Sequence, residues 1–273
     1  MENILIQIDG LIEGSVQHRP SKHCRSPYVA DVSVGDNNVI AHAPSLGCCG
    51  YADSGACVMI KENEGKKTKV CTHTLYLSKV VEKGHEYIVG IHPKIAERIV
   101  EKLIEGNYIP TLQNSTQIER EKTYLNSRFD FTGTDENGKK FILEVKNSPC
   151  ADYEDISHKE RKGKDYTSWS YDSKIAYFPD GYRKNVKDTV SPRALKHIQE
   201  LEKIKLENEG IRTIIVYIIQ RSDIVHFQPS NIDMIYKNAV KQAFENGVEI
   251  FPISVVWDED GRCRFNKVLP LKF

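Results

Sequence analysis

The stretch RFDFTGTDENGKKFILEVKN, residues 128–147, contains two strand-like segments on either side of the turn signal Glu-Asn-Gly. This pattern predicts a β-hairpin. Side chains alternate between the two faces of a strand, so Glu144 and Lys146 share one face of the second strand. In the first strand, Arg128 and Asp130 lie on the face away from the phenylalanines. If the two strands pair in register, Asp130 lies beside Glu144.

Two neighbouring carboxylates and a lysine suit a hard divalent cation. Mg²⁺ or Mn²⁺ prefers oxygen ligands, and water and substrate phosphate commonly complete its shell. We therefore expect Asp130 and Glu144 to bind the metal, and Glu119 in the preceding strand to support it or to bind a second ion. Lys146 would position the attacking water or stabilise the phosphate oxygens. The alternative is that Glu144 and Lys146 form an ion pair on a solvated strand, without a functional role.

The chain divides into two parts of different pattern. Its 273 residues, of which 40% are hydrophobic, are sufficient for two domains with separate cores. Residues 1–91 contain short strand-like segments separated by turn signals, which predicts a small β-barrel of the oligonucleotide-binding (OB) type. Residues 92–273 alternate strand and helix patterns and predict an α/β domain, so the whole chain is α+β. Helices are predicted at 92–106, 191–210 and 231–247, and a buried central strand at 212–220.

The overall charge excludes a strong whole-molecule field. The 38 basic residues balance the 38 acidic ones, so any binding of nucleic acid requires a local patch. The first residues lack the pattern of a signal peptide, and no later segment has the length of a membrane span. We therefore expect a soluble intracellular protein, cytoplasmic or nuclear, with no membrane partner.

The seven cysteines are odd in number and show no Cys-x-x-Cys spacing. This argues against a disulfide framework and against a structural zinc site. The adjacent pair Cys48 and Cys49 is expected to consist of reduced loop or core residues. A redox or metal role for this pair is the alternative.

Several ordered segments resemble one known family. SRFDF, ILEVKN, YFPDG, RALKHIQEL and NIDMIYKNAVKQAFENGVEIFPI resemble the corresponding segments of the sugar fermentation stimulation protein A (SfsA) family. The resemblance implies an N-terminal OB-type barrel, a C-terminal restriction-endonuclease-like domain of the PD-(D/E)XK type, and an association with DNA. It also implies that Asp130 is the motif aspartate, that Glu144 and Lys146 form the E-x-K pair, and that Glu119 matches a further acid.

The resemblance extends to a second group of residues. Arg193, Lys196 and His197 match an arginine, a lysine and a histidine that the family carries in the helix after the Phe-Pro-Asp segment. Asp180 is the aspartate of that segment, and it joins the expected metal ligands.

Two features depart from the family pattern. Residues 148–190 are longer than the usual connection, which suggests an insertion over the cleft. Before the segment VADV, the family has a basic residue next to an aromatic one, whereas this chain has Ser26, Pro27 and Tyr28, with Arg25 displaced.

A local excess of positive charge offers a surface for nucleic acid. From Ile156 to Lys196 there are ten lysines and arginines against five acids. The same segment is rich in aromatic residues: Tyr166, Trp169, Tyr171, Tyr177, Phe178 and Tyr182. Cations and stacking rings are typical of a single-strand groove. The alternative is a solvated loop whose aromatic side chains fix it to the core. The candidate nucleic-acid contacts are Arg25, Arg128, Trp169, Arg193, Lys196 and His197.

The sequence therefore predicts a DNA-binding protein with a Mg²⁺- or Mn²⁺-dependent nuclease site. Two alternatives stay open: a regulator that keeps the nuclease-like fold but does not cut, and a phosphodiesterase that acts on RNA or on a nucleotide. The strandedness of the DNA and the presence of a homodimer also stay open.

Overall fold

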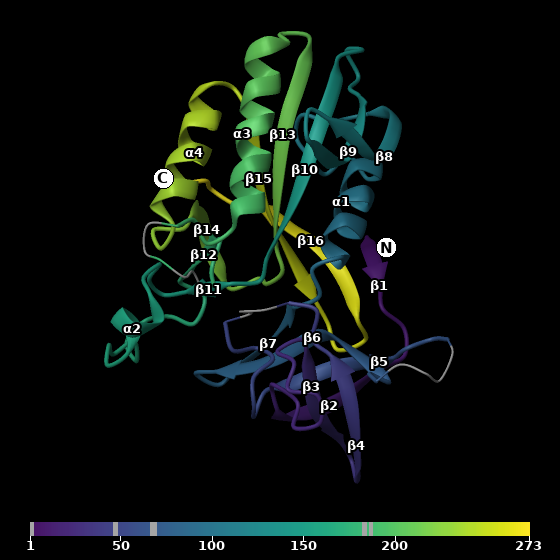
Figure 1. Ribbon diagram of the computed structural model, residues 1–273, viewed down its shortest axis with the longest axis vertical. Helices are drawn as coiled ribbons and strands as arrows, with labels where there is room; N and C mark the ends of the chain where they lie inside the picture. Colours follow the sequence, from purple (N-terminus) through teal and green to yellow (C-terminus); the bar gives the residue numbers. More distant parts are fainter. Residues whose placement is uncertain (1–2, 46–48, 66–69, 182–184, 186–187) are drawn as a thin grey trace.

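The computed structural model describes residues 3–45, 49–65, 70–181, 185 and 188–273. Two residues named above, Cys48 and Tyr182, lie outside these ranges. The chain forms a helix-covered mixed sheet above a small β-barrel (Figure 1). The α+β fold class is thus confirmed.

The larger sheet has seven strands in the order β1-β16-β15-β13-β10-β9-β8. Their bounds are β1 Ile4–Gln7, β8 Thr116–Tyr124, β9 Ser127–Thr134, β10 Lys140–Ser148, β13 Ile211–Ile219, β15 Glu249–Trp257 and β16 Arg262–Val268. Strands β10, β13 and β15 run parallel to one another, and the outer pairs are antiparallel. The central strand β13 carries the predicted apolar run, because both faces of the sheet are covered.

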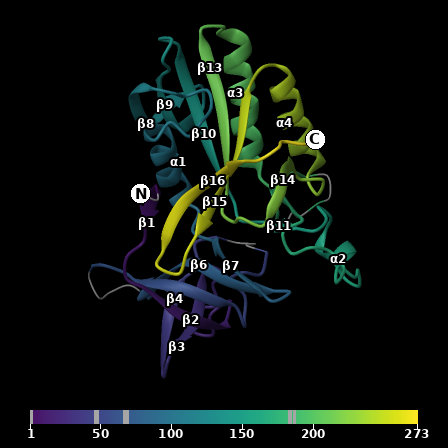
Figure 2. The same cartoon turned by 180° about the vertical axis from the view of Figure 1, so that it is seen from behind.

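Helices cover both faces of this sheet (Figures 1 and 2). Helix α1 (Ile95–Glu105) packs on one face, where its buried residues meet Phe131 and Leu143. Helices α3 (Pro192–Glu207) and α4 (Met234–Glu245) pack on the other face. The Ser191 hydroxyl accepts a hydrogen bond from the amide of Ala194 and so begins α3, as the Ser-Pro pair predicts.

The barrel consists of β2 Leu11–His18, β3 Val29–Val34, β4 Asn37–His42, β5 Cys57–Glu62, β6 His73–Glu82 and β7 His85–Gly90. Its sheet order is β4-β3-β2-β5-β6-β7, and an additional parallel pairing of β4 with β6 closes β2 to β6 into a five-stranded ring, with β7 paired to β6 outside it. This closure is the arrangement expected of an OB-type barrel. Its core is small and aliphatic, with Val58, Leu75 and Val89 fully buried.

One strand expected in the barrel lies elsewhere. Strand β1 pairs antiparallel with β16 at the edge of the seven-stranded sheet, so Ile4–Gln7 does not join the barrel sheet. Leu5 and Ile6 are buried there against the core of the larger sheet. The division of the chain near residue 91 otherwise stays a prediction.

Residues 148–190 contain short regular elements rather than a plain loop. They form β11 (Ala151–Asp152), helix α2 (His158–Arg161) and β12 (Lys174–Phe178), and β12 pairs with β14 (Ile224–Pro229) in a three-stranded sheet. Sequence patterning missed this sheet because its strands are short and far apart in the chain.

A buried ionic network fixes the barrel to the larger domain. Arg221 is fully buried and donates to both carboxylate oxygens of Asp223 at 2.6 Å. It also donates to the hydroxyl oxygens of Tyr51 and Tyr87, which belong to the barrel. Lys174 bridges Asp223 at 2.9 Å and Glu82 of the barrel at 2.7 Å.

Within the described ranges, none of the helices is long and apolar enough to span a bilayer.

Candidate functional site

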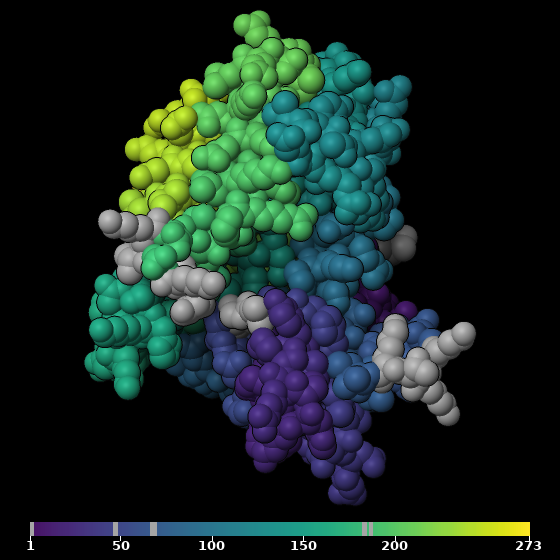
Figure 3. Space-filling model, viewed as in Figure 1, coloured from purple at the N-terminus to yellow at the C-terminus, as the bar shows by residue number. Residues whose placement is uncertain are grey.

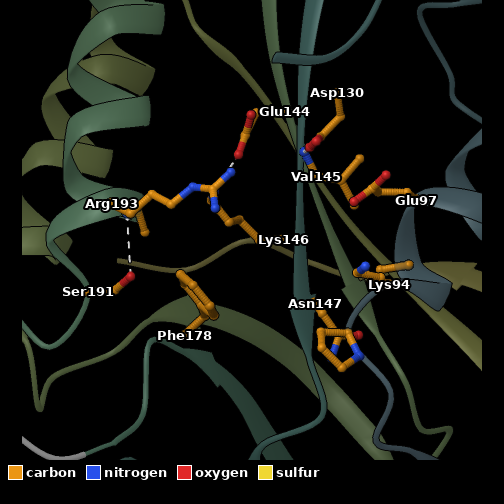
Figure 4. Close-up of a pocket in the computed structure, with 13 residues that line it drawn as sticks. Lys94, Glu97, Asp130, Glu144, Val145, Lys146, Asn147, Phe178, Ser191 and Arg193 are labelled. Carbon is orange, nitrogen blue, oxygen red and sulfur yellow. Dashed lines mark hydrogen bonds and ion pairs between the residues drawn. The ribbon is translucent and has the colours of Figure 1, made fainter. Parts of the chain in front are cut away.

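A cavity of about 350 Å³ lies where β10 passes between α1 and the start of α3 (Figure 4). The surface is hollowed where green α3, blue α1 and the purple barrel approach one another (Figure 3). The charged residues that line the cavity come from four segments of the chain: Lys94, Glu97, Asp130, Glu144, Lys146 and Arg193. The sheet and its covering helices thus bring distant acids and cations to one place.

Asp130 lies where the β9–β10 ladder ends. The two strands pair in the predicted register, with Leu143 opposite Phe131. At the next position, Asp130 Oδ2 accepts a hydrogen bond of 2.7 Å from the amide of Val145. Burial and the negative charges of Glu144 and Glu97 raise the pKa of Asp130 to about 7. The site therefore binds the proton of Asp130 at a pH where a solvated aspartate is fully ionised.

Glu144 is almost completely buried, with 3% of its surface exposed. Its Oε1 atom accepts a hydrogen bond of 2.5 Å from Lys146 Nζ and also contacts His197 Nδ1. Although burial raises the pKa of Glu144, Lys146 and His197 hold it below its usual value. Its Oε2 atom is buried and has no hydrogen-bond partner among the described residues.

His197 reaches Glu144 from helix α3. Its ring is buried, and Nδ1 lies 3.5 Å from Lys146 Nζ as well as in contact with Glu144. Because Glu144 is ionised, the histidine donates from Nδ1 and holds the carboxylate in place. His197 is therefore a positioning residue in this geometry, while its expected contact with nucleic acid stays a prediction.

A third acid, Glu97, lines the cavity with Asp130 and Glu144, whereas the predicted Glu119 lies elsewhere. Glu97 lines the cavity from α1, and one of its oxygens accepts a hydrogen bond of 2.9 Å from Arg120. Glu119 is exposed, lies opposite Thr132 on the edge strand β8 and pairs with Lys122 at 3.2 Å. Its partner Thr132 is two residues from Asp130 in β9, and Glu119 is not among the described residues that line the cavity.

Sequence reasoning missed Glu97 because this residue belongs to an acidic stripe on α1 that is typical of a solvated helix face. The usable signal was its place in the first turn of α1, the end of the helix nearest the cavity.

Asp180 does not meet the other predicted ligands. Among the described residues that line the cavity, Phe178 is present and Asp180 is absent. The carboxylate of Asp180 instead lies 3.8 Å from Cys49 Sγ, beside Cys150. The chain passes the cavity at Phe178 and has turned toward the barrel by Asp180, so the structure does not bring Asp180 to the other predicted ligands.

The candidate nucleic-acid contacts separate into two groups. Arg193 lines the cavity, and Lys196 on the same helix donates a hydrogen bond of 2.5 Å to the carbonyl oxygen of Asn126. Arg128 is exposed, and its Nη2 atom lies 3.5 Å from Glu121 of the edge strand β8. Arg25 lies on the barrel surface between β2 and β3.

The aromatic residues of the 148–190 segment mainly fix it to the barrel. Tyr171 stacks on His85 of the barrel with ring centroids 3.7 Å apart. Tyr166 and Trp169 pack against Tyr153, and barrel residue Lys83 donates to the carbonyl oxygens of both Tyr166 and Trp169. Trp169 keeps 42% of its surface exposed. These contacts favour the interpretation of a segment pinned to the core, with Trp169 as its accessible ring.

The residues of the cavity fit a divalent cation. Glu144 Oε2 is a buried carboxylate oxygen with no hydrogen-bond partner in the part of the chain that the structure describes, and a buried unpaired acceptor is energetically costly. Asp130 and Glu97 supply further oxygens on the same cavity. An all-oxygen set of acids is the chemistry that Mg²⁺, Mn²⁺ or Ca²⁺ requires.

Comparison with known proteins assigns the family. The model described as "Sugar fermentation stimulation protein RE domain" matches residues 94–157 and 164–261. The chain belongs to the SfsA family. Within the 148–190 segment, the match leaves out residues 158–163, which contain α2. That this segment is longer than the usual connection in the family stays a prediction.

SfsA-family relatives match over most of their length. The sugar fermentation stimulation protein homolog of Clostridium tetani is 29% identical over 237 residues, which covers 85% of this chain and 87% of the relative. The homolog of Synechococcus elongatus is 28% identical over 249 residues, with 90% of each chain covered. The structure of Pyrococcus furiosus SfsA in complex with Ca²⁺ superposes with a TM-score of 0.74 at 20% identity, covering 99% of this chain and 100% of that chain. This structural likeness confirms the SfsA fold.

Proposed function

We propose that this chain is a Mg²⁺-dependent nuclease that binds DNA and hydrolyses its phosphodiester bonds. The observation that carries the proposal is the buried Oε2 atom of Glu144, which has no partner among the described residues and lies near Asp130, whose pKa is raised to about 7. Carboxylate oxygens that the cations of the cavity leave unpaired are where a divalent cation would bind. The solved SfsA of Pyrococcus furiosus was determined in complex with Ca²⁺, a cation that also prefers oxygen ligands.

In this proposal the acids hold the cation. Asp130 and Glu144 are the principal ligands, and Glu97 takes the supporting role that the sequence assigned to Glu119. A bound divalent cation would neutralise the charge that builds on the phosphate during hydrolysis. His197 keeps Glu144 ionised and oriented by its contact with Oε1.

The cations of the cavity take the remaining roles. Lys146 Nζ lies beside Glu144, where it can orient the attacking water or stabilise the phosphate oxygens. Lys94 and Arg193 line opposite walls of the cavity and supply positive charge to the phosphates of a bound strand (Figure 4). The strand would approach between α1 and α3, where the surface is hollowed.

The test compares metal binding and cleavage in matched variants. Calorimetry with Mg²⁺ and Mn²⁺ is followed by incubation with labelled single-stranded and double-stranded DNA, and with RNA of matched sequence. Wild type is expected to bind metal and cut DNA, whereas Asp130→Ala and Glu144→Ala lose both properties. Lys146→Met is expected to retain metal binding and to cut about 10²- to 10³-fold more slowly. Glu119→Ala removes an acid of the same sheet outside the cavity, so it should behave as wild type.

Two outcomes would replace this proposal. If wild type binds DNA without metal and the alanine variants bind it equally well or better, the protein is a regulator that has kept a nuclease-like fold. If the RNA is cut and the DNA is not, the substrate class changes while the assignment of the acids stands.

A further inference from the structure

A second cluster of ligand-type side chains lies between the barrel and the larger domain. Cys49 comes from the connection between β4 and β5, Cys150 from the turn between β10 and β11, and Asp180 from the residues after β12. One ligand atom from each of the three lies within 4.8 Å of the others. Cys150 is buried, and the other two residues are half-buried. Three segments far apart in the sequence thus converge on one point.

The spacing of these atoms suits an ion better than a direct bond. Sulfur and oxygen ligands about 2.0–2.3 Å from a shared Zn²⁺ lie roughly 3.3–3.8 Å from each other in a tetrahedral shell. Cys49 Sγ and Asp180 Oδ2 are already 3.8 Å apart. A disulfide between the cysteines would instead require their sulfurs to approach to about 2.05 Å. A small contraction would therefore bring the three atoms to the spacing of ligands in a zinc shell.

The donor types select a different metal from that of the first cavity. Two thiolates and one carboxylate suit a borderline-soft ion such as Zn²⁺, whereas the acids around Asp130 suit a hard ion. Arg161 lies beside this cluster, with Nη1 2.9 Å from the hydroxyl oxygen of Tyr177, and it offsets part of the negative charge that three anionic ligands bring.

The cluster also has a route for entry. Cys49 lines a second cavity of about 590 Å³ between the barrel and residues 151–167. An ion can reach the sulfur from this cavity, and a fourth coordination position can open toward it. Arg161, Lys162 and Lys164 line the same cavity, so an anion or a water is the suitable fourth ligand.

We propose that Cys49, Cys150 and Asp180 bind a Zn²⁺ ion that joins the barrel to the larger domain. Two of its ligands continue segments that line the first cavity: Cys150 follows Asn147 of β10, and Asp180 follows Phe178 of β12. The ion therefore ties the barrel to the two segments that carry the proposed nuclease site.

Cobalt is the probe for this site. Chelator-stripped full-length protein, kept reduced, is titrated with Co²⁺ alone. Wild type is expected to show a thiolate-to-cobalt charge-transfer band and the visible bands of tetrahedral cobalt at one equivalent, and Zn²⁺ should remove both. Cys49→Ser and Cys150→Ser each leave one thiolate, so the charge-transfer band should fall by half or more, and Asp180→Asn should weaken Co²⁺ binding at least tenfold. Cys24→Ser is the matched control, because Cys24 is exposed on the barrel surface and should change nothing.

Further arms separate this site from the proposed nuclease site. The double variant Asp130→Ala/Glu144→Ala should keep the cobalt spectrum of wild type whether or not the protein is a nuclease. Zn²⁺ should raise the thermal unfolding temperature of wild type and of this double variant, but not that of folded Cys49→Ser. Absence of the charge-transfer band in wild type would overturn the proposal. So would a reduced protein that binds no metal but forms a Cys49–Cys150 disulfide on oxidation.

Discussion

His197 on helix α3 contacts the same carboxylate oxygen of Glu144 that Lys146 reaches, so the histidine helps to keep a buried acid ionised. Replacing it by alanine removes a donor, and the pKa of Glu144 should rise. We expect His197→Ala to weaken Mg²⁺ binding about 10- to 100-fold, as is usual for outer partners of metal ligands. The loss should be greater at pH 6 than at pH 8, because protonated Glu144 competes with the metal at the lower pH.

Calorimetric titrations at the two pH values test this prediction. His197→Gln keeps a donor and should recover part of the affinity. Lys203→Ala, an exposed site on the same helix, is the control. An equal loss of affinity at both pH values would show that His197 supports only the fold.

The raised pKa of Asp130 should make the stability of the protein depend on pH. Its pKa of about 7 in the folded protein is above the value of roughly 3.9 in an unfolded chain. The folded state therefore holds the proton more tightly than the unfolded chain. The resulting contribution to the free energy of unfolding is complete below about pH 4 and is lost as the pH rises through 7. Asp130→Asn removes the dependence. The free energy of unfolding of the variant minus that of wild type should rise by about 2–4 kcal/mol from pH 4 to pH 8.

Urea denaturation in metal-free buffer measures this difference. Adding Mg²⁺ at pH 8 should stabilise wild type and reduce the gap, because the cation replaces the missing charge. Stability curves that run parallel from pH 4 to pH 8 would contradict the raised pKa.

Glu97 and Glu119 give opposite predictions although both are acids near the same sheet. Glu97→Gln removes a negative charge from the cavity and should weaken Mg²⁺ binding about tenfold, the low end of the range for supporting groups. Glu101→Gln is the matched control, since Glu101 also pairs with Arg120, at 3.4 Å, without lining the cavity. Glu119→Gln should bind Mg²⁺ like wild type. If Glu119→Gln and not Glu97→Gln loses affinity, the assignment of the third acid is reversed.

Arg221 should be a strong determinant of stability. Arg221→Ala leaves Asp223 buried with Lys174 as its remaining cation and deprives Tyr51 and Tyr87 of their donor. We expect the free energy of unfolding to fall by about 3–5 kcal/mol. Lys241→Ala removes an exposed cation 3.9 Å from Glu245 and should cost no more than about 0.5 kcal/mol. Equilibrium denaturation of both variants gives the comparison, and similar small losses would mean that the network does not hold the domains together.

Local patterning predicted much of the fold. The turn and the hydrophobic face of residues 128–147 correctly predicted the hairpin register up to Leu143 opposite Phe131, and Asp130 and Glu144 line the same cavity. The strict alternation fails around Asp130, because Phe129 packs in the core with α3 and Phe131 in the core with α1. The capping signals correctly marked the start of α3 after Ser191 and the end of α1 before Gly106, whereas α3 ends at Glu207, before the predicted glycine stop. These features depend on neighbours in the sequence.

Features that depend on contacts between distant segments could not be predicted from the sequence. Glu97 lies on a helix that packs against the sheet only in the folded chain, and no spacing links it to Asp130. Asp180 follows a short strand whose partner, β14, lies many residues later. The meeting of Cys49 with Cys150 likewise has no sequence spacing, so the adjacent pair Cys48 and Cys49 gave no indication of it.

The pairing of β1 with β16 also sets an order of events during synthesis. Strand β1 leaves the ribosome before the barrel, whereas β16 emerges after almost all of the chain. Leu5 and Ile6 therefore become buried only after β16 is made, whereas all the strands of the barrel are made earlier. Contacts between such distant segments form slowly, because a long loop must close first. The barrel can thus fold early. The pairing of β1 with β16 forms late, so a product that lacks β16 leaves the edge of β1 unpaired.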